Sequence, residues 1–170
     1  KLPPFKLERY FARYEFNTEF LLCSSDCESM SIADLLAFED GAAERFHNHW
    51  LGYTESLGSP TLRKEIATIY STTKPEDILV FAGANEAIYL FMMAALKEND
   101  HIIVHAPHYQ SLSEVAKGIG CMVSPWRARE ENGWALDLDE LRHLMRSSTK
   151  AIIVNVPHNP TGYLMPRANF

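Results

Sequence analysis

Three short stretches of the chain combine residue types that could together bind a planar, phosphorylated ligand. The first stretch, AGANEA at 82–87, has the small residues Gly83 and Ala84 where an apolar run gives way to a helical one. Small residues let the backbone come close to a ligand, and the free N–H groups at a helix N-terminus favour a phosphate. A plain strand-to-helix connection could have the same residues, because a single glycine falls short of a dinucleotide fingerprint.

The second stretch, APHYQS at 106–111, follows another apolar run. Pro107 is expected to fix the turn and to leave Tyr109 at the open edge of the sheet, where its flat ring, with a polar hydroxyl at one end, could stack on a planar ligand. The alternative is that Tyr109 only covers the edge of a sheet. His108 is open to the same doubt, because a single histidine is more often structural than catalytic.

The third stretch, NPTG at 159–162, follows the apolar run AIIVNV. The amide of Asn159 can donate and accept hydrogen bonds, Pro160 stiffens the turn, and Gly162 permits a backbone conformation that other residues resist. The same residues also make a good turn without any function. If the three stretches lie at one edge of a sheet, they combine a phosphate-binding helix N-terminus, an aromatic ring that can stack on a ligand and an amide donor. That combination suits a planar, phosphorylated aromatic cofactor.

The segments between these stretches predict the sheet that must position them. Four short, apolar, β-rich runs predict strands at 77–81, 101–105, 121–126 and 151–156. Helical runs lie between them at 84–96, 111–117 and 138–145, and the first is apolar nearly all round, which predicts a buried helix. This alternation predicts an α/β fold with a mostly parallel, doubly wound sheet flanked by helices. Ligands of such sheets bind outside the carboxyl ends of the strands.

The first half of the chain predicts helices and loops. Pro3 and Pro4 preclude an early helix start, so the first thirty residues are expected to form an arm and a lead-in loop. Ser31 is a plausible N-cap for a helical run that Gly41 interrupts, and Ser59 before Pro60 predicts the start of another helix. We expect residues 1–50 to form an N-terminal arm and lead-in segment, and residues 51–170 to belong to a larger domain.

The composition narrows the classes of partner. The 170 residues are 46% hydrophobic and 22% charged, which suits a packed domain, and the net charge of -6 without a basic cluster argues against nucleic acid and anionic membranes. The longest apolar run is about half of what a bilayer-spanning helix needs, and no leader pattern opens the chain, so a cytoplasmic protein is predicted.

Cysteines and histidines give no sign of a disulfide framework or a metal site. The three cysteines, Cys23, Cys27 and Cys121, fit neither an even set of disulfides nor a paired CxxC metal motif, so free thiols are expected. The HNH triplet formed by His47 to His49 lacks carboxylate or cysteine partners at ligand spacing. We expect no metal.

Taken together, the motifs resemble those of the class I and II aminotransferases, fold-type I enzymes that use pyridoxal 5′-phosphate (PLP). The likeness is close from Leu51 to Met165 and loose over the first fifty residues. Besides NPTG, the stretch GYTESLGSPTLRKEIA at 52–67 is similar to a family pattern of Tyr, four residues, Gly, three residues, then Leu-Arg. Several spaced matches in one order are more specific than any single match. The resemblance implies that residues 51–170 are the N-terminal part of the PLP-binding large domain of a fold-type I enzyme, which is incomplete here, and that residues 1–50 are part of the small domain or dimer contact.

This resemblance also implies how the cofactor phosphate is bound. Gly83, Ala84 and Asn85 would hold the phosphate largely through backbone N–H groups. Some relatives have hydroxyl side chains at the positions of Gly83 and Asn85, so the backbone and helix end are expected to contribute more of the binding here. Tyr53 would reach the phosphate of the neighbouring subunit, which implies a homodimer with shared sites.

Further roles implied by the resemblance concern the cofactor ring and the reacting groups. Tyr109 would stack on the pyridine ring, and Asn159 would hydrogen-bond its phenolic oxygen. The lysine that forms the Schiff base, the aspartate that pairs with the pyridine nitrogen and the arginine that binds the substrate carboxylate follow NPTG in the family, and are expected beyond Phe170. No catalytic residue is therefore expected within the chain. We expect an N-terminal fragment, inactive by itself, that lacks the rest of the large domain and a C-terminal small domain.

The activity implied by the family is transfer of an amino group from an amino acid to a keto acid. A PLP lyase, oxidase or cyclising synthase of the same fold is an alternative, because fold does not fix reaction. A non-catalytic, aminotransferase-like sensor domain is another, although no basic helix-turn-helix precedes Leu51. A nucleotide-binding Rossmann domain is disfavoured by the missing glycine fingerprint.

Overall fold

The computed structural model describes residues 2–170, which divide into two compact units. One unit combines the residues up to Ser25 with Gly83–Phe170, and the other is Asp26–Ala82. The first unit contains a three-stranded sheet with its flanking helices. The loops that carry Gly83, Tyr109 and Asn159 all belong to this first unit, whereas Tyr53 belongs to the second.

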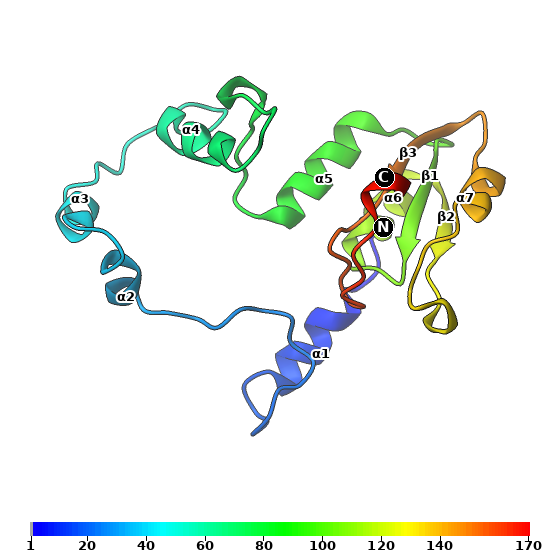
Figure 1. Cartoon of the computed structure of the whole chain (residues 1–170), viewed down its shortest axis with the longest axis horizontal. Coiled ribbons are helices and arrows are strands. Elements are labelled where there is room, and N and C mark those ends of the chain that lie inside the picture. The colour runs from blue at the N-terminus through cyan, green and yellow to red at the C-terminus, as the bar shows by residue number, and fades with distance from the viewer. Residues whose placement is uncertain (1) are drawn as a thin grey trace. The chain divides into compact units, whose positions relative to one another are not determined.

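The sheet is parallel, as the alternation of strand and helix predicts. Its strands are β1 (His101–Ala106), β2 (Met122–Arg127) and β3 (Thr149–Ile153), in the order β2-β1-β3 (Figure 1). Ile102 pairs with Val123 on one side and with Ala151 on the other. Every residue of β1 is buried, as expected for a central strand with both faces covered. Because β2 and β3 lie on opposite sides of β1, the chain reverses its winding after β2.

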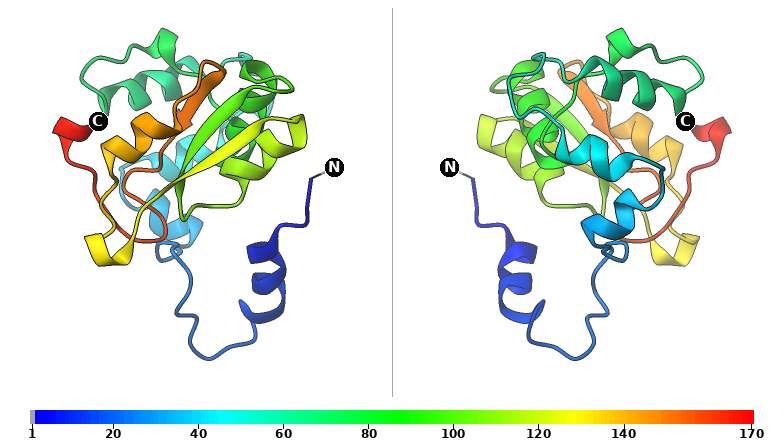
Figure 2. Two further views of the ribbon diagram at one scale, coloured as in Figure 1. Left: turned by 90° about the vertical axis from the view of Figure 1, so that its right-hand side faces the viewer. Right: turned by 90° about the vertical axis from the view of Figure 1, so that its left-hand side faces the viewer.

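Helices cover both faces of this sheet (Figure 2). They are α5 (Ala84–Ala95), α6 (Ser111–Ile119) and α7 (Leu138–Leu144). Successive strand residues point to opposite faces. Ile102 and Val104 therefore pack in a cluster with residues of α5 and α6, while Ile103 packs in a second cluster with Trp126 and residues of α7. The predicted doubly wound α/β fold is confirmed.

The prediction of a strand at 77–81 is wrong. Pro75–Asp77 form a short 3₁₀ helix, η1, and the residues that follow join no sheet in the described chain. The Val80 N–H donates to Leu57 O at 3.0 Å, a loop residue of the same unit. An apolar run becomes a strand only when a neighbouring strand supplies a continuous ladder of backbone partners, and residues 26–82 contain no such strand.

The expectation that the helix at 84–96 is buried also needs correction. Met92 is the single buried residue of α5, and the side chains of Leu90, Phe91 and Met93 are exposed. Only the face of α5 that carries Ile88 and Met92 packs in the core cluster beneath β1. An apolar helix is buried all round only if other elements cover its remaining faces.

The other predicted strands and helices form close to their expected bounds, and the N-terminal arm contains the helix α1 (Lys6–Tyr14), whose N-cap Phe5 follows the two prolines. In the second unit, α2 (Ile32–Leu36) starts with a capping box between Ser31 and Asp34. The remaining helices there are α3 (Ala42–His47) and α4 (Pro60–Thr68). Two further 3₁₀ helices, η2 (Glu130–Asn132) and η3 (Arg167–Asn169), lie in the first unit. Across residues 2–170, no helix combines the length and apolar character that crossing a membrane requires.

Candidate functional site

His158 joins the loop after β1 to the loop after β3. Its Nε2–H donates to Pro107 O at 2.7 Å, and its Nδ1 lies 2.7 Å from Thr161 Oγ1. A carbonyl oxygen can only accept, so Nε2 carries the proton and the neutral Nδ1 accepts from the Thr161 hydroxyl. The ring is only 2% exposed, so each of these hydrogen bonds satisfies a buried polar group. Both loops are thereby fixed to each other at the carboxyl end of the sheet.

His105, at the end of β1, stacks on the His158 ring. The two ring centroids are 3.6 Å apart and the planes differ by 17°. His105 is buried, and neither of its ring nitrogens has a hydrogen-bond partner among the described residues. Burial lowers the pKa of His105 to about 4, with smaller contributions from His158 and His108. Burial also lowers the pKa of His158, so both rings are neutral near pH 7 and the tautomer that joins the loops is preserved.

Tyr109 lies two residues before the start of α6 and is half-buried. Its hydroxyl donates to Glu8 Oε1 at 3.1 Å, and its ring centroid is 4.9 Å from that of Phe5. Its carbonyl accepts the N–H of Leu112 at 3.0 Å, which continues the backbone into the helix. A partly exposed aromatic ring is thus held at the carboxyl end of β1, where it could stack on a planar ligand.

Asn159 is exposed at the tip of the turn that follows β3. Its N–H donates to Asn155 Oδ1 at 2.9 Å, and its side-chain amide donates to Ser25 Oγ at 3.3 Å. The turn is closed by the Gly162 N–H, which donates to His158 O at 2.7 Å. Gly162 has φ of +74°, the left-handed conformation that its sequence position predicts. The geometry keeps the Asn159 amide at the surface and within reach of a ligand.

Gly83 immediately precedes the first residue of α5. Its φ of +141° suits only glycine, and no atom lies within 4 Å of the position that a Cβ would occupy. The glycine supplies no side-chain cap, so α5 starts with N–H groups at Ala84 and Asn85 beside open space. An uncapped helix N-terminus with room beside it fits a phosphate group.

Not every predicted site residue is brought together. His158 links the loop of Tyr109 to the loop of Asn159. Within residues 2–170, no hydrogen bond joins the start of α5, Gly83–Asn85, to either of these two loops. Tyr53 belongs to the other unit, Asp26–Ala82, and its side chain is fully exposed.

Sequence reasoning missed the histidine pair. The letters HNPTG place His158 next to Asn159, but neither its burial nor its bond to Pro107 can be read from spacing, because Pro107 is 51 residues away. In the described part of the chain no three metal-binding side chains come together, and Cys23, Cys27 and Cys121 are all free thiols.

Comparison with known proteins identifies the family. The sequence model of the family "Aminotransferase class I and II" matches residues 20–170. Capreomycidine synthase of Streptomyces vinaceus is 31% identical over 163 residues, which are 95% of this chain and 42% of that protein. An aspartate aminotransferase of Sulfurisphaera tokodaii is 32% identical over 129 residues, 72% of this chain and 32% of that protein.

Solved structures agree with the sequence comparison. The crystal structure of a PLP-dependent aminotransferase from Streptococcus suis superposes with a TM-score of 0.92 at 33% identity, covering 99% of this chain and 46% of that one. The chain therefore spans less than half the length of the relatives it matches. With a parallel sheet and a family match over most of its length, the chain belongs to the class I and II aminotransferases, whose cofactor is pyridoxal phosphate.

Proposed function

We propose that the full-length protein transfers an amino group from an amino acid to a keto acid, and that this chain provides the phosphate site, the stacking ring and the hydrogen bond to the phenolic oxygen of PLP. The observation that carries the proposal is the link from His158 to Pro107, which holds the loops of Tyr109 and Asn159 together at the carboxyl end of a parallel sheet. Bound PLP supplies an electron sink for the negative charge that develops on the substrate α-carbon. The residues of this chain bind and orient it.

In this proposal the start of α5 binds the cofactor phosphate. Gly83 leaves open space where a side chain would stand, and Ala84 and Asn85 present backbone N–H groups at the positive end of the helix. Tyr53 of the partner subunit adds a hydroxyl to the same phosphate, so the active form is a homodimer. The full exposure of Tyr53 leaves its side chain available for this contact.

The two linked loops orient the cofactor ring. Tyr109 stacks on the pyridine ring, which its half-buried position at the end of β1 supports. Asn159 donates a hydrogen bond from its side-chain amide to the phenolic oxygen of the ring. That donor contacts Ser25 Oγ at 3.3 Å, a weak, exposed hydrogen bond that a ligand oxygen can replace.

The reacting lysine belongs to the part of the protein after Phe170 in this proposal. None of the seven lysines has the sequence context of the family's lysine: Lys1, Lys6, Lys64, Lys74, Lys97, Lys117 and Lys150. The 170 residues by themselves are then inactive. The arm over 1–50, the large domain from 51 and a cytoplasmic location remain predictions.

The test is to reduce the full-length gene product with borohydride in the presence of PLP and to locate the modified residue by mass spectrometry. A single modified lysine after Phe170 supports the proposal, and incubation with an amino acid should then give a keto acid and the aminated cofactor. Scattered labelling, or none, overturns it. A single labelled lysine without turnover of any amino acid would instead indicate a sensor domain.

A cyclising synthase is the second candidate, and one observation favours it. Capreomycidine synthase matches 95% of the chain, and the structure of the PLP-dependent cyclase OrfR superposes on 99% of it with a TM-score of 0.87 at 28% identity. Relatives named as transaminases match the chain equally fully, so both reactions stay candidates. Product analysis separates the two candidates, because a synthase leaves the cofactor in its original form and yields a cyclic amino acid.

A further inference from the structure

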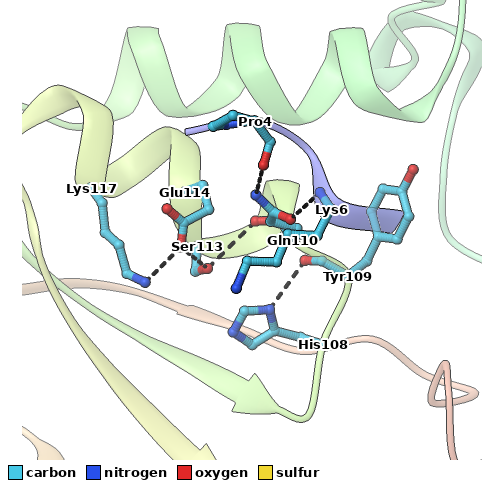
Figure 3. Close-up of polar contacts among 8 residues, drawn as sticks. All are labelled: Pro4, Lys6, His108, Tyr109, Gln110, Ser113, Glu114 and Lys117. Carbon is cyan, nitrogen blue, oxygen red and sulfur yellow. Dashed lines mark hydrogen bonds and ion pairs between the residues drawn. The ribbon is translucent and has the colours of Figure 1, made fainter. Parts of the chain in front are cut away.

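The side chain of Gln110 binds the backbone of the N-terminal segment, Pro4–Glu8, at two points (Figure 3). Its Nε2 donates to Pro4 O at 3.0 Å, and its Oε1 accepts the Lys6 N–H at 3.0 Å. The amide therefore uses both its donor and its acceptor on a segment more than 100 residues away in the sequence. Gln110 itself is half-buried and directly precedes α6.

The bond to Lys6 also caps helix α1. Lys6 is the first residue of α1, and its N–H has no partner inside the helix. The N-cap residue, Phe5, makes no side-chain capping bond. Gln110 Oε1 supplies the missing acceptor from another element, so the start of α1 depends on Gln110.

Tyr109 is held by the same N-terminal segment. The Phe5 ring lies 4.9 Å from the Tyr109 ring, and Glu8 Oε1 accepts the Tyr109 hydroxyl at 3.1 Å. Leu2, just before this segment, packs against Gly118 of α6: a Cβ added at Gly118 would lie 2.6 Å from Leu2 Cδ2. Both the body and the polar tip of the Tyr109 ring thus contact the segment that Gln110 anchors.

From these contacts we propose that Gln110 is a positioning residue for the cofactor: it anchors the N-terminal segment, which in turn fixes the ring of Tyr109. The inference rests on the proposed function, in which Tyr109 stacks on PLP. A half-exposed tyrosine samples several rotamers, and ordering its ring during binding weakens the affinity. A ring that Phe5 and Glu8 already hold loses less freedom when the cofactor arrives, so the segment increases affinity without touching PLP.

The test uses the full-length protein with Gln110→Met, which keeps the length of the side chain and removes both hydrogen bonds. The apparent dissociation constant for PLP, measured by spectroscopic titration of the apoprotein, should rise roughly fivefold, as expected when two ordinary hydrogen bonds are lost and part of their effect reaches Tyr109. Hydrogen–deuterium exchange of the backbone amides of residues 5–10 should become faster in the same variant. Gln110→Glu retains the acceptor for the Lys6 N–H but loses the donor to Pro4 O, so its dissociation constant for PLP should lie between those of the wild type and Gln110→Met. Lys117→Gln, on the exposed side of α6, is the matched control and should change neither quantity.

A deletion of residues 2–8 separates this role from a general effect on the loop. The deletion should weaken PLP binding about as much as Gln110→Met, and adding Gln110→Met to the deletion should have no further effect, because Gln110 acts through the segment. A second, additive loss in the double variant would overturn the inference, as would unchanged PLP affinity in Gln110→Met. If the wild-type protein fails to bind PLP at all, it is the proposed function that fails.

Discussion

His158 Nε2 lies 2.7 Å from Pro107 O and connects two loops that are 51 residues apart in the sequence. The first loop carries Tyr109 and the second carries Asn159. The position of one proposed PLP contact is therefore coupled to the position of the other through a single buried imidazole. The stacked ring of His105 supports this imidazole from one side.

Replacing His158 by Phe should destabilise the protein by about 2–3 kcal/mol, because the variant keeps a ring to stack on His105 but leaves Pro107 O and the Thr161 hydroxyl without their partner. PLP affinity should fall as well. Urea unfolding of the full-length protein measures the stability. His143→Phe, at an exposed histidine of α7, is the control and should cost less than about 0.5 kcal/mol. Equal losses in the two variants would contradict the structural role of His158.

The stability should fall as the pH drops from about 6.5 toward 4. The pKa of His105 is about 4 in the folded protein, against an ordinary value of 6.5, so the unfolded chain takes up a proton first. The contribution is complete above pH 6.5, decreases as the pH falls through this window and is lost below pH 4. The difference between the two pKa values corresponds to roughly 3 kcal/mol.

Urea unfolding at several pH values between 4 and 7.5 checks this dependence. In His105→Phe the free energy of unfolding should fall less steeply over the same window, because the titrating group is gone while an aromatic ring remains. The depressed pKa of His158 acts in the same direction and leaves part of the slope in place. Parallel profiles for the variant and the wild type would refute the assignment.

Gly83→Ala should weaken PLP binding and lower stability by about 1–2 kcal/mol. Its φ of +141° is costly for any residue with a Cβ, although the space around it is open. Gly133→Ala is the matched control, since Gly133 also has positive φ and open surroundings but follows η2 and belongs to none of the three loops proposed to bind PLP. Both variants should lose stability, and only Gly83→Ala should lose affinity for PLP in a titration.

Asn159→Ala in the full-length protein should reduce PLP retention or change the absorption spectrum of the bound cofactor, because the proposed hydrogen bond to the phenolic oxygen is lost. Dialysis followed by absorbance spectroscopy measures both effects. Asn169→Ala, at an exposed residue of η3, should behave as the wild type. If Asn159→Ala leaves both PLP retention and the absorption spectrum unchanged, the role assigned to the Asn159 amide is wrong.

The three thiols should react at different rates with iodoacetamide. Cys23 and Cys27 are exposed, whereas Cys121 is buried in the cluster between α5, α6 and the sheet. Burial, with a smaller contribution from Asp100, raises the pKa of the Cys121 thiol and lowers its thiolate fraction. Mass spectrometry should therefore find Cys121 modified last, and only after urea is added. Rapid modification of Cys121 in the native protein would contradict this packing.

The sequence by itself determined the order of the elements from β1 to β3. Runs such as HIIVH have the composition of a buried strand, and the caps and breakers that bound helices lie within a few residues of them. These signals are local, so β1, α6, β2, α7 and β3 could be predicted from short windows. The spaced motifs, NPTG foremost, were sufficient to indicate the family.

Only the tertiary structure decided which residues meet across the chain. Residues 77–81 have a strand-like composition, yet no ladder partner is present in their unit, and the apolar surface of α5 is packed on one face alone. His158 acquires its role from Pro107, and Gln110 acquires its role from Pro4 and Lys6. Each of these outcomes depends on a partner more than twenty residues distant in the sequence, and the identity of such a partner is set by how the chain packs rather than by local residue pattern.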